Sequence, residues 1–468
     1  MKFKLLIGGN LVRGARSLDV INPATGQVFE QCARADMQQL EDAVSTAHFA
    51  FPTWSRRTTD ERASFLLKLA DALEARQDEM ATLITLEQGK PLSDAVWEVA
   101  GSVACLRYTA TLDLPLRTLR TSENERIVEQ RVPHGVVATI TPWNVPLILL
   151  VMKLAPALLA GNTVVSKPAP TTPLSTLLLG EIAVDILPAG VFNTIVDDND
   201  LGSALSAHPD IAMVSFTGST ATGRKVMATA AGTIKRVTLE LGGNDPAILL
   251  EDIDIDEVIP KVFAAAMINN GQVCLAAKRI YVPASIYEPV CAALAKLAEN
   301  AVVGNGLEKG VHFGPIQNAQ QFEKLKTYLR NAHDYGVVIA GGNVIDRPGY
   351  FIQPTVVRDI EDDAAVVHEE QFGPIIPVLS YDALETVIER ANNSEFGLGA
   401  TVWSTNIDKA YDVACQLTAG TVWVNQHLAM PFDIPVGGAK QSGLGVQQGI
   451  KGLEEFTQLK IINMKLQA

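Results

Sequence analysis

The sequence predicts an α/β protein with two doubly wound α/β domains, each built around a largely parallel sheet. Apolar strands alternate with helical segments from Gly135 onward, and this pattern is typical of strand–helix–strand units with parallel strands. A second alternating series begins after Gly243. The chain has 468 residues, which is more than one ordinary core holds, so two or three domains are expected.

Composition and charge favour a cytoplasmic enzyme over a protein that binds nucleic acid or membranes. The formal net charge of -14 at pH 7 opposes binding to nucleic acid or to an anionic membrane surface. The 5 cysteines are odd in number and lack C-x-x-C spacing, so they indicate neither a disulfide framework nor a metal site. The chain contains no apolar run that suits a signal peptide or a membrane span.

Short strands and then helices are expected in the N-terminal part of the chain. The turn at Asn22–Gly26 separates strands within residues 1–30. Thr58 and Glu61 have the spacing of a capping box, so a helix begins there and runs through Arg76. Two further helices are expected, over residues 78–87 and 92–108.

Residues 117–132 form a candidate arm. The segment is polar and charged, and the alternation over residues 126–132 predicts exposed strands. Unpaired backbone groups on such strands invite pairing with another chain or domain, so the arm is a candidate oligomer contact. A plain surface hairpin is the alternative interpretation.

The first alternating series is the candidate dinucleotide-binding region, because ligands of doubly wound sheets bind at the carboxyl ends of the strands. Its strands are expected over residues 136–141, 163–166, 191–196 and 212–216, with helices over residues 146–159, 173–185 and about 220–232. The second series has expected strands over residues 247–250, 279–282, 337–340, 375–379 and 421–425. A helix over residues 258–268 in this series leads to Cys274.

Cys274 stands on a turn where a substrate can reach it. Asn269–Gly271 ends the preceding helix, and the cysteine follows three residues later. An accessible thiolate with a lowered pKa attacks carbonyl groups and forms covalent intermediates. The alternative is that Cys274 is a small buried hydrophobic residue, as most free cysteines are.

Asn144 and Glu240 are candidate partners for this chemistry. Asn144 lies between two prolines at a strand-to-helix junction, where it can cap the helix or stabilise an oxyanion through its amide. Glu240 ends an apolar strand, and burial there would raise its pKa and make it a usable general base. A carboxylate on a surface turn is the alternative for Glu240.

The usual G-x-G-x-x-G dinucleotide motif is absent after every expected strand. Residues 216–220 instead join a strand to a helix, and the free N–H groups of that helix's first turn can hold a pyrophosphate. A simple turn capped by Ser219 or Thr220 explains the same residues equally well.

Taken together, these segments closely resemble the aldehyde dehydrogenase superfamily over nearly the whole chain, from Asn22 to Gly443. The motifs that carry the resemblance occur in the family's order: Thr141-Pro142-Trp143-Asn144, Lys167-Pro168, Phe216-Thr217-Gly218-Ser219, Leu239-Glu240-Leu241-Gly242-Gly243, Gly271-Gln272-x-Cys274, Glu369-Glu370-x-Phe372-Gly373-Pro374 and Gly437-Gly438-x-Lys440-x-Ser442-Gly443.

The resemblance implies a mechanism of covalent catalysis. Cys274 would attack the aldehyde to form a thiohemiacetal, while the Asn144 amide and the Cys274 backbone N–H hold the oxyanion. Hydride transfer to the nicotinamide of NAD or NADP would leave a thioester. Glu240 would then activate the water that releases the acid.

The resemblance also implies the coenzyme contacts. Lys167 would reach the adenosine ribose, and Trp143 with the turn Thr217-Gly218-Ser219 would contact the pyrophosphate region. Glu370 and Phe372 would position the nicotinamide ribose and ring.

Three positions depart from the family's pattern. Many relatives that prefer NAD carry a glutamate where this chain has Pro170, and that carboxylate repels a 2'-phosphate. Its absence leaves NAD against NADP open, with NAD favoured. Asn244 and Val436 replace a frequent lysine and phenylalanine, and these changes are expected to alter packing or pocket shape.

Pocket walls implied by the resemblance predict an uncharged aliphatic or aromatic aldehyde, because a carboxylated one would need a cationic partner. These walls are Val145, Ile148, Met152, Val273, Leu275 and residues 426–432, and they are mostly apolar. A coenzyme A-acylating or semialdehyde dehydrogenase of the same superfamily is the alternative, and a non-catalytic structural or binding protein is a more distant one.

The expected domain limits follow the same resemblance. Residues 1–116 and 133–242 would form the cofactor-binding domain, and residues 243–435 the catalytic domain. Residues 117–132 and 436–468 would form the oligomerisation arm and the C-terminal segment, giving a homodimer or homotetramer.

Overall fold

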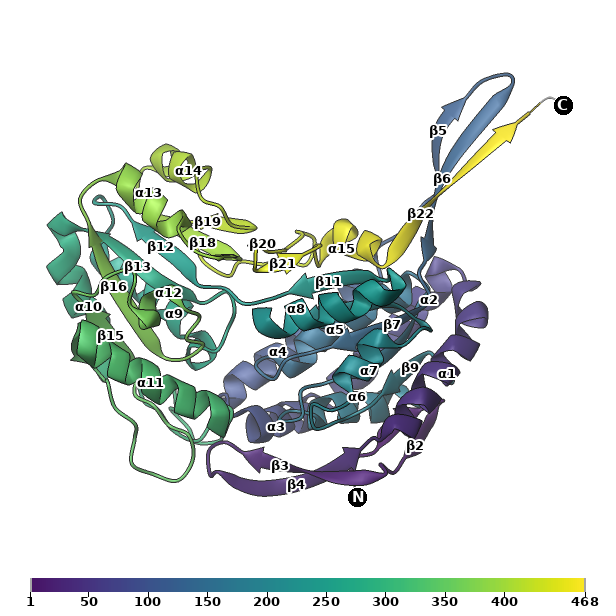
Figure 1. Cartoon of the computed structure of the whole chain (residues 1–468), viewed down its shortest axis with the longest axis horizontal. Coiled ribbons are helices and arrows are strands. Elements are labelled where there is room, and N and C mark those ends of the chain that lie inside the picture. The colour runs from purple at the N-terminus through teal and green to yellow at the C-terminus, as the bar shows by residue number, and fades with distance from the viewer. Residues whose placement is uncertain (1, 467–468) are drawn as a thin grey trace.

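The computed structural model describes residues 2–466, in which two helix-covered sheets lie side by side and a strand arm projects from one of them (Figure 1). The first sheet contains β1 (Leu5–Ile7), β2 (Asn10–Val12), β7 (Val136–Ile140), β8 (Thr163–Lys167), β9 (Phe192–Thr194), β10 (Ile211–Thr217), β11 (Arg236–Glu240) and β21 (Gly443–Leu444). Around it lie α1 (Met37–Ser55), α2 (Thr59–Ala75), α3 (Gln77–Gln88), α4 (Leu92–Thr109), α5 (Pro146–Leu159), α6 (Leu174–Ala183), α7 (Gly202–Ala207) and α8 (Thr220–Ala230). A hairpin of β3 (Arg16–Asn22) and β4 (Gln27–Arg34) lies beside them.

The strand order of the first sheet is β2-β1-β9-β8-β7-β10-β11-β21. The strands β7 to β11 are parallel, and the two edges of the sheet are antiparallel. The chain moves outward from β7 through β8 to β9, then returns and moves the other way through β10 to β11. The order therefore reverses between β7 and β10, and ligands of doubly wound sheets bind at such a switch point.

The second sheet has the order β14-β15-β16-β13-β12-β18-β19 and is parallel except at β14. Its strands are β12 (Asp245–Leu249), β13 (Ala277–Pro283), β14 (Val337–Ala340), β15 (Thr355–Arg358), β16 (Ile375–Tyr381), β18 (Gly399–Trp403) and β19 (Thr421–Val424). Its helices are α9 (Ile255–Met267), α10 (Tyr287–Glu299), α11 (Ala319–Tyr335), α12 (Ala365–His368), α13 (Leu384–Asn392) and α14 (Ile407–Ala414). Two apolar clusters cover the two faces of this sheet. Both are separate from the larger apolar core of the first sheet.

The segment after the second sheet returns to the first. Ala439–Lys440 (β20) pairs with Phe396–Gly397 (β17), and β21 then pairs with β11 at the edge of the first sheet. The helix α15 (Gly449–Glu455) follows and leads into the arm. This path brings the C-terminal segment over both halves of the molecule (Figure 1).

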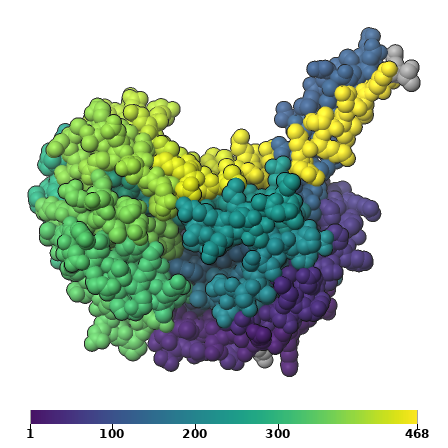
Figure 2. Space-filling model, in the orientation of Figure 1, coloured from purple at the N-terminus to yellow at the C-terminus, as the bar shows by residue number. Residues whose placement is uncertain are grey.

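The arm consists of β5 (Arg117–Thr121), β6 (Glu125–Pro133) and β22 (Thr457–Lys465) in the order β22-β6-β5. Residues 457–465 pair antiparallel with residues 125–133 along their whole length. Every residue of β5 is exposed. Figure 2 shows the arm standing clear of the rounded body, which is hollowed where its green half meets its teal half. The C-terminal segment thus packs against the arm through β22.

Most expected elements are present, and the exceptions have local causes. The capping box of Thr58 and Glu61 is formed, and it begins α2 as expected. The helix α1 was not expected from the sequence, and it contains Pro52, a residue that usually ends or kinks a helix. The strand β18 was also missed because it begins with Gly399 and Ala400, which have low strand propensity. The short β15 was missed as well.

None of the helices described over residues 2–466 is long and apolar enough to cross a membrane.

Candidate active site

The turn before Cys274 has an unusual backbone. The helix α9 ends at Met267, and a short turn (Ile268–Gly271, η2) follows. Asn269, Asn270 and Gly271 have φ angles of 49°, 57° and 72°, in the left-handed region that asparagine and glycine tolerate best. Any side chain at Gly271 would collide with the Gly373 carbonyl. The sequence therefore supplies the residues that let the chain reverse tightly before the cysteine.

Side-chain hydrogen bonds hold this turn in place. The Asn269 Nδ2 donates to the Asn144 carbonyl at 2.9 Å, and the Asn270 Nδ2 donates to the Gly314 carbonyl at 2.8 Å. The Gln272 side chain donates to the Pro315 carbonyl at 3.3 Å and accepts from the Gln317 N–H at 2.9 Å. A strained backbone persists only where its surroundings fix it, and these bonds do so.

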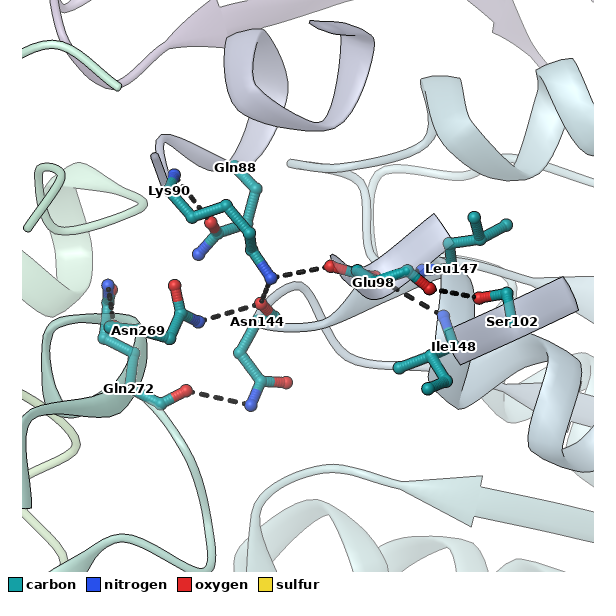
Figure 3. Close-up of polar contacts among 9 residues, drawn as sticks. All are labelled: Gln88, Lys90, Glu98, Ser102, Asn144, Leu147, Ile148, Asn269 and Gln272. Carbon is teal, nitrogen blue, oxygen red and sulfur yellow. Dashed lines mark hydrogen bonds and ion pairs between the residues drawn. The ribbon is translucent and has the colours of Figure 1, made fainter. Parts of the chain in front are cut away.

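Asn144 is buried and connects the turn to the first sheet (Figure 3). Its Nδ2 donates to the Gln272 carbonyl at 2.9 Å, two residues before Cys274. An amide nitrogen carries two hydrogens. One of them fixes the side chain against the cysteine turn, and the other is available to a second acceptor such as an oxyanion.

A buried ion pair supports the Asn144 backbone. The Lys90 Nζ donates to the Asn144 carbonyl at 3.0 Å and lies 2.6 Å from the Glu98 Oε2. The other Glu98 oxygen accepts from the Leu147 N–H at 2.8 Å, at the start of α5. A carboxylate at a helix N-terminus satisfies N–H groups that have no partner within the helix. Figure 3 shows this chain of contacts running from α4 to the cysteine turn. Lys90 and Glu98 were not predicted, because nothing in their local sequence connects them to Asn144.

The surroundings of Cys274 raise the pKa of its thiol. Burial is the largest cause, and the carboxylates of Glu370, Glu240 and Asp245 add to it. The side chains of the chain by themselves therefore do not lower the pKa of this thiol, because the nearby side-chain charges are negative. A base must remove the thiol proton before Cys274 can act as a nucleophile.

Glu240 has the properties of a general base. It is the last residue of β11, and burial raises its pKa to about 8, although Lys153 acts in the opposite direction. Its Oε1 is buried with no hydrogen-bond partner. Lys153 extends from α5, is fully buried, and donates to the Ser215 hydroxyl at 3.2 Å. The expected rise in the Glu240 pKa is confirmed, whereas Lys153 was not foreseen.

A loop from the second sheet carries Glu370 and Phe372 to the same region. The Glu370 Oε1 accepts from the Gly243 N–H at 3.0 Å, and burial raises the pKa of Glu370 to about 7. Phe372 has a φ of 57° and packs edge-on against Trp143, with 5.3 Å between the ring centroids. The structure thus brings together Trp143 and Phe372, which the sequence analysis assigned to one coenzyme site.

The Thr217-Gly218-Ser219 turn lies at the carboxyl end of β10, beside the switch point. Ser219 caps α8 by accepting from the Thr222 N–H at 3.3 Å, so the capping interpretation is correct. The Thr217 hydroxyl is buried with no partner. An unpartnered hydroxyl beside a helix N-terminus fits the pyrophosphate of NAD or NADP.

Lys167 and Pro170 lie at the end of β8 and in the turn after it. Pro170 offers no carboxylate, as expected, and Lys167 instead forms a buried ion pair with Asp197, with 2.6 Å between Nζ and Oδ1. Asp197 could not be predicted from the sequence, because it follows a different strand, β9.

Apolar side chains surround Cys274. The cysteine packs with Val273, Leu275, Leu428 and Met430 in one cluster with Leu398 and Trp423. A neighbouring cavity of about 600 Å³ is lined in part by Val145, Val273, Trp97, Phe263 and Phe313. The expected wall residue Met152 lies in a separate small cavity beside Phe432. The residues expected to form one pocket wall therefore lie on several separate surfaces, which are the cluster around Cys274 and the two cavities.

His427 fixes the far side of the cysteine turn. Its Nε2 lies 2.6 Å from the Leu275 carbonyl. Burial lowers the pKa of His427 to about 4, so the ring is neutral near pH 7 and its Nε2 must carry the hydrogen that it donates. His427 lies within residues 426–432, which the sequence treated only as a pocket wall.

Lys278 connects the end of α9 to the Phe372 loop. Its Nζ donates to the Gly373 carbonyl at 2.6 Å and to the Ala266 carbonyl at 3.1 Å. Burial lowers the pKa of Lys278 to about 7. This role could not be predicted from the sequence, because the partners are backbone carbonyls on separate elements.

An NAD(P)-dependent aldehyde dehydrogenase requires three features, and the structure has all of them. They are parallel strand ends that suit a dinucleotide, a cysteine that a substrate can reach, and a buried carboxyl base. Residues 12–462 match the aldehyde dehydrogenase family, and the chain belongs to that family. It is similar to a phenylacetaldehyde dehydrogenase of Pseudomonas fluorescens, with 41% identity over 97% of this chain and 94% of the relative.

One further relative and one solved structure show the same family resemblance. A mitochondrial succinate-semialdehyde dehydrogenase of Oryza sativa subsp. japonica is 37% identical over 98% of this chain and 89% of its own length. The solved structure of an aldehyde dehydrogenase from Bacillus cereus in complex with NAD+ superposes with a TM-score of 0.97 and 39% identity, covering 100% of this chain and 97% of that one. These similarities support NAD or NADP as the coenzyme.

Proposed function

We propose that the chain oxidises an uncharged, hydrophobic aldehyde to its carboxylic acid, with Cys274 as nucleophile, Asn144 as oxyanion donor and Glu240 as general base. The observation that carries the proposal is the bond from the Asn144 amide to the Gln272 carbonyl, which fixes a hydrogen-bond donor against the cysteine turn. The family membership of the chain supports the same roles.

The first step needs a proton acceptor, since the Cys274 thiol has a raised pKa. The thiol proton passes to solvent, and the thiolate adds to the aldehyde carbon to form a thiohemiacetal. The free hydrogen of the Asn144 amide stabilises the oxyanion. A bound nicotinamide would supply the hydride acceptor and a positive charge.

The second step releases the product. Cys274 holds the acyl group as a thioester after the oxidation. Glu240 accepts a proton from water, and the resulting hydroxide attacks the thioester carbon. The carbon–sulfur bond then breaks, the carboxylic acid leaves, and the Cys274 thiolate takes the proton back from Glu240. The buried, unpartnered Glu240 oxygen supports this role, because it has an acceptor site free for a water hydrogen.

The coenzyme would lie across the carboxyl ends of the first sheet. Lys167 would hold the adenosine ribose, and Trp143 with Thr217, Gly218 and Ser219 would hold the pyrophosphate. Glu370 and Phe372 would hold the nicotinamide end, where Phe372 already contacts Trp143.

The apolar cluster around Cys274 supports a hydrophobic substrate. A carboxylated aldehyde would lose its hydration there, and Lys90, which lies in the lining of the neighbouring cavity, is already paired with Glu98. The similarity to a phenylacetaldehyde dehydrogenase agrees with this choice, while the similarity to a succinate-semialdehyde dehydrogenase represents the alternative.

Steady-state kinetics over an aldehyde panel test the substrate class. We expect kcat/KM for phenylacetaldehyde and octanal to exceed that for succinic semialdehyde by at least ~10-fold, because a desolvated, unpaired carboxylate is costly. A preference for succinic semialdehyde would contradict the proposal. Acid release that depends on added coenzyme A would instead identify an acylating dehydrogenase.

A further inference from the structure

We propose that Asp197 makes the chain prefer NAD to NADP by neutralising Lys167 at the adenosine end of the coenzyme site. The inference rests on the proposed function, since it names the coenzyme of the same site. It also answers the question that Pro170 leaves open, namely which group supplies the negative charge that opposes a 2'-phosphate.

The sheet order places the adenosine ribose. In doubly wound sheets, the dinucleotide crosses the carboxyl ends of the strands at the switch point, and a residue at the end of the strand after the first binding strand contacts the ribose 2'-hydroxyl. Here β7 is the first of these strands and β8 the second. Lys167 is the last residue of β8, and Asp197 follows the adjacent strand β9.

The Lys167–Asp197 pair is held from several sides. The Lys167 Nζ lies 2.6 Å from the Asp197 Oδ1, and both side chains are buried. The Asp197 Oδ2 accepts from the Leu201 N–H at 2.9 Å, so both carboxylate oxygens are engaged. Gly202 lies so close that an added side-chain carbon would be 3.3 Å from the Lys167 Cε. Lys167 is therefore committed to Asp197 and is not free to turn toward a phosphate.

The neighbouring charged side chains also oppose the binding of a 2'-phosphate. Arg34 is bonded to Asp198 at 3.3 Å and to Asp200 at 2.8 Å. Lys167 and Arg34 thus pair with three carboxylates, those of Asp197, Asp198 and Asp200. A phosphate monoester would add nearly two further negative charges, whereas a ribose hydroxyl adds none. The geometry favours the hydroxyl, which can both donate to a carboxylate and accept from an ammonium group.

The ion pair could serve only to hold residues 197–202 in place, and Asp197→Asn separates the two roles. Asparagine keeps the volume and an acceptor for the Leu201 N–H, while it releases the positive charge of Lys167. A purely structural role predicts equal weakening of NAD-type and NADP-type ligands. A role in coenzyme choice predicts weaker selection against the 2'-phosphate.

Calorimetric titration of the full chain with ADP-ribose and with 2'-phospho-ADP-ribose provides a test that needs no turnover. The wild type is expected to bind ADP-ribose at least ~10-fold more tightly, and Asp197→Asn to reduce this ratio by about 10-fold or more. Asp198→Asn is the matched control on the same loop. Its carboxylate is largely exposed, so the ratio should change less than about threefold.

Asp197→Ser, which also keeps an acceptor for the Leu201 N–H, is the second variant if Asp197→Asn does not fold. A wild-type preference for the 2'-phosphorylated ligand would overturn the inference, as would an unchanged ratio in the folded variant. Binding of neither ligand would contradict the coenzyme site of the proposed function itself, which distinguishes the two failures.

Discussion

Glu240 and Lys153 influence each other's charge across the buried space between β11 and α5. Burial raises the pKa of Glu240 to about 8 and lowers that of Lys153 to about 8. Each charge favours the other, so removing Lys153 leaves the carboxylate with only the unfavourable effect of burial. The residue proposed as the base is therefore tuned by a lysine that touches neither the thiol nor the solvent.

The pH profile of the reaction tests this coupling. A base works in its deprotonated form, so the rate should rise as pH increases through about 8 and level off above it. Lys153→Met should move this rise to higher pH by one unit or more, because the nearby positive charge is lost. The measurement is kcat against pH with phenylacetaldehyde.

Glu257→Gln removes an exposed carboxylate on α9 and should leave the profile in place. A Lys153→Met profile that coincides with that of the wild type would show that Lys153 does not act on the base.

At the scale of elements, the cysteine turn combines a helix end with three left-handed residues. The sequence predicted this turn correctly because asparagine and glycine favour that backbone locally. The same reasoning found the capping box of α2. It could not find Lys90, Asp197 or His427, because each acts through a partner on a distant element whose position only the tertiary fold determines.

Substitutions at Asn269 separate backbone strain from hydrogen bonding. Asn269→Gly keeps the left-handed backbone and removes only the bond to the Asn144 carbonyl, whereas Asn269→Ala also imposes strain. We expect the alanine variant to lose about 1–2 kcal/mol more stability than the glycine variant.

Thermal and urea unfolding give these stabilities, and kcat should fall in both variants because Asn144 loses one of its anchors. Equal stability of the two variants would mean that the turn relaxes and stores no strain. An unchanged kcat in both would separate Asn269 from the oxyanion donor.

At the scale of the whole molecule, two largely parallel sheets lie side by side, and the C-terminal segment crosses both (Figure 1). The fold class could be predicted because alternation of strands and helices is a property of the local sequence. The site could be predicted only in part, by the resemblance of separated motifs. The exact domain limits and the oligomeric state stay predictions.

The exposed arm predicts association between subunits. Leu459 and Ile461 are 53% and 49% exposed on β22, an edge strand of the arm. We expect light scattering to give a homodimer or homotetramer of the 50.2 kDa chain, and Leu459→Lys with Ile461→Lys to shift it toward smaller species. Lys460→Gln, an exposed neighbour, is the control. A monomeric wild type at micromolar concentration would contradict an oligomerisation arm.

The central claim is that Cys274 carries the acyl group and that Glu240 promotes its release. Intact-mass and peptide mass spectrometry of Glu240→Gln after mixing with phenylacetaldehyde and NAD test both parts directly. The predicted result is one phenylacetyl group on Cys274, with none on the exposed Cys415, and no adduct in Cys274→Ala. An unmodified Cys274 in a variant that still forms NADH, or near-normal NADH formation by Cys274→Ala, would contradict the account.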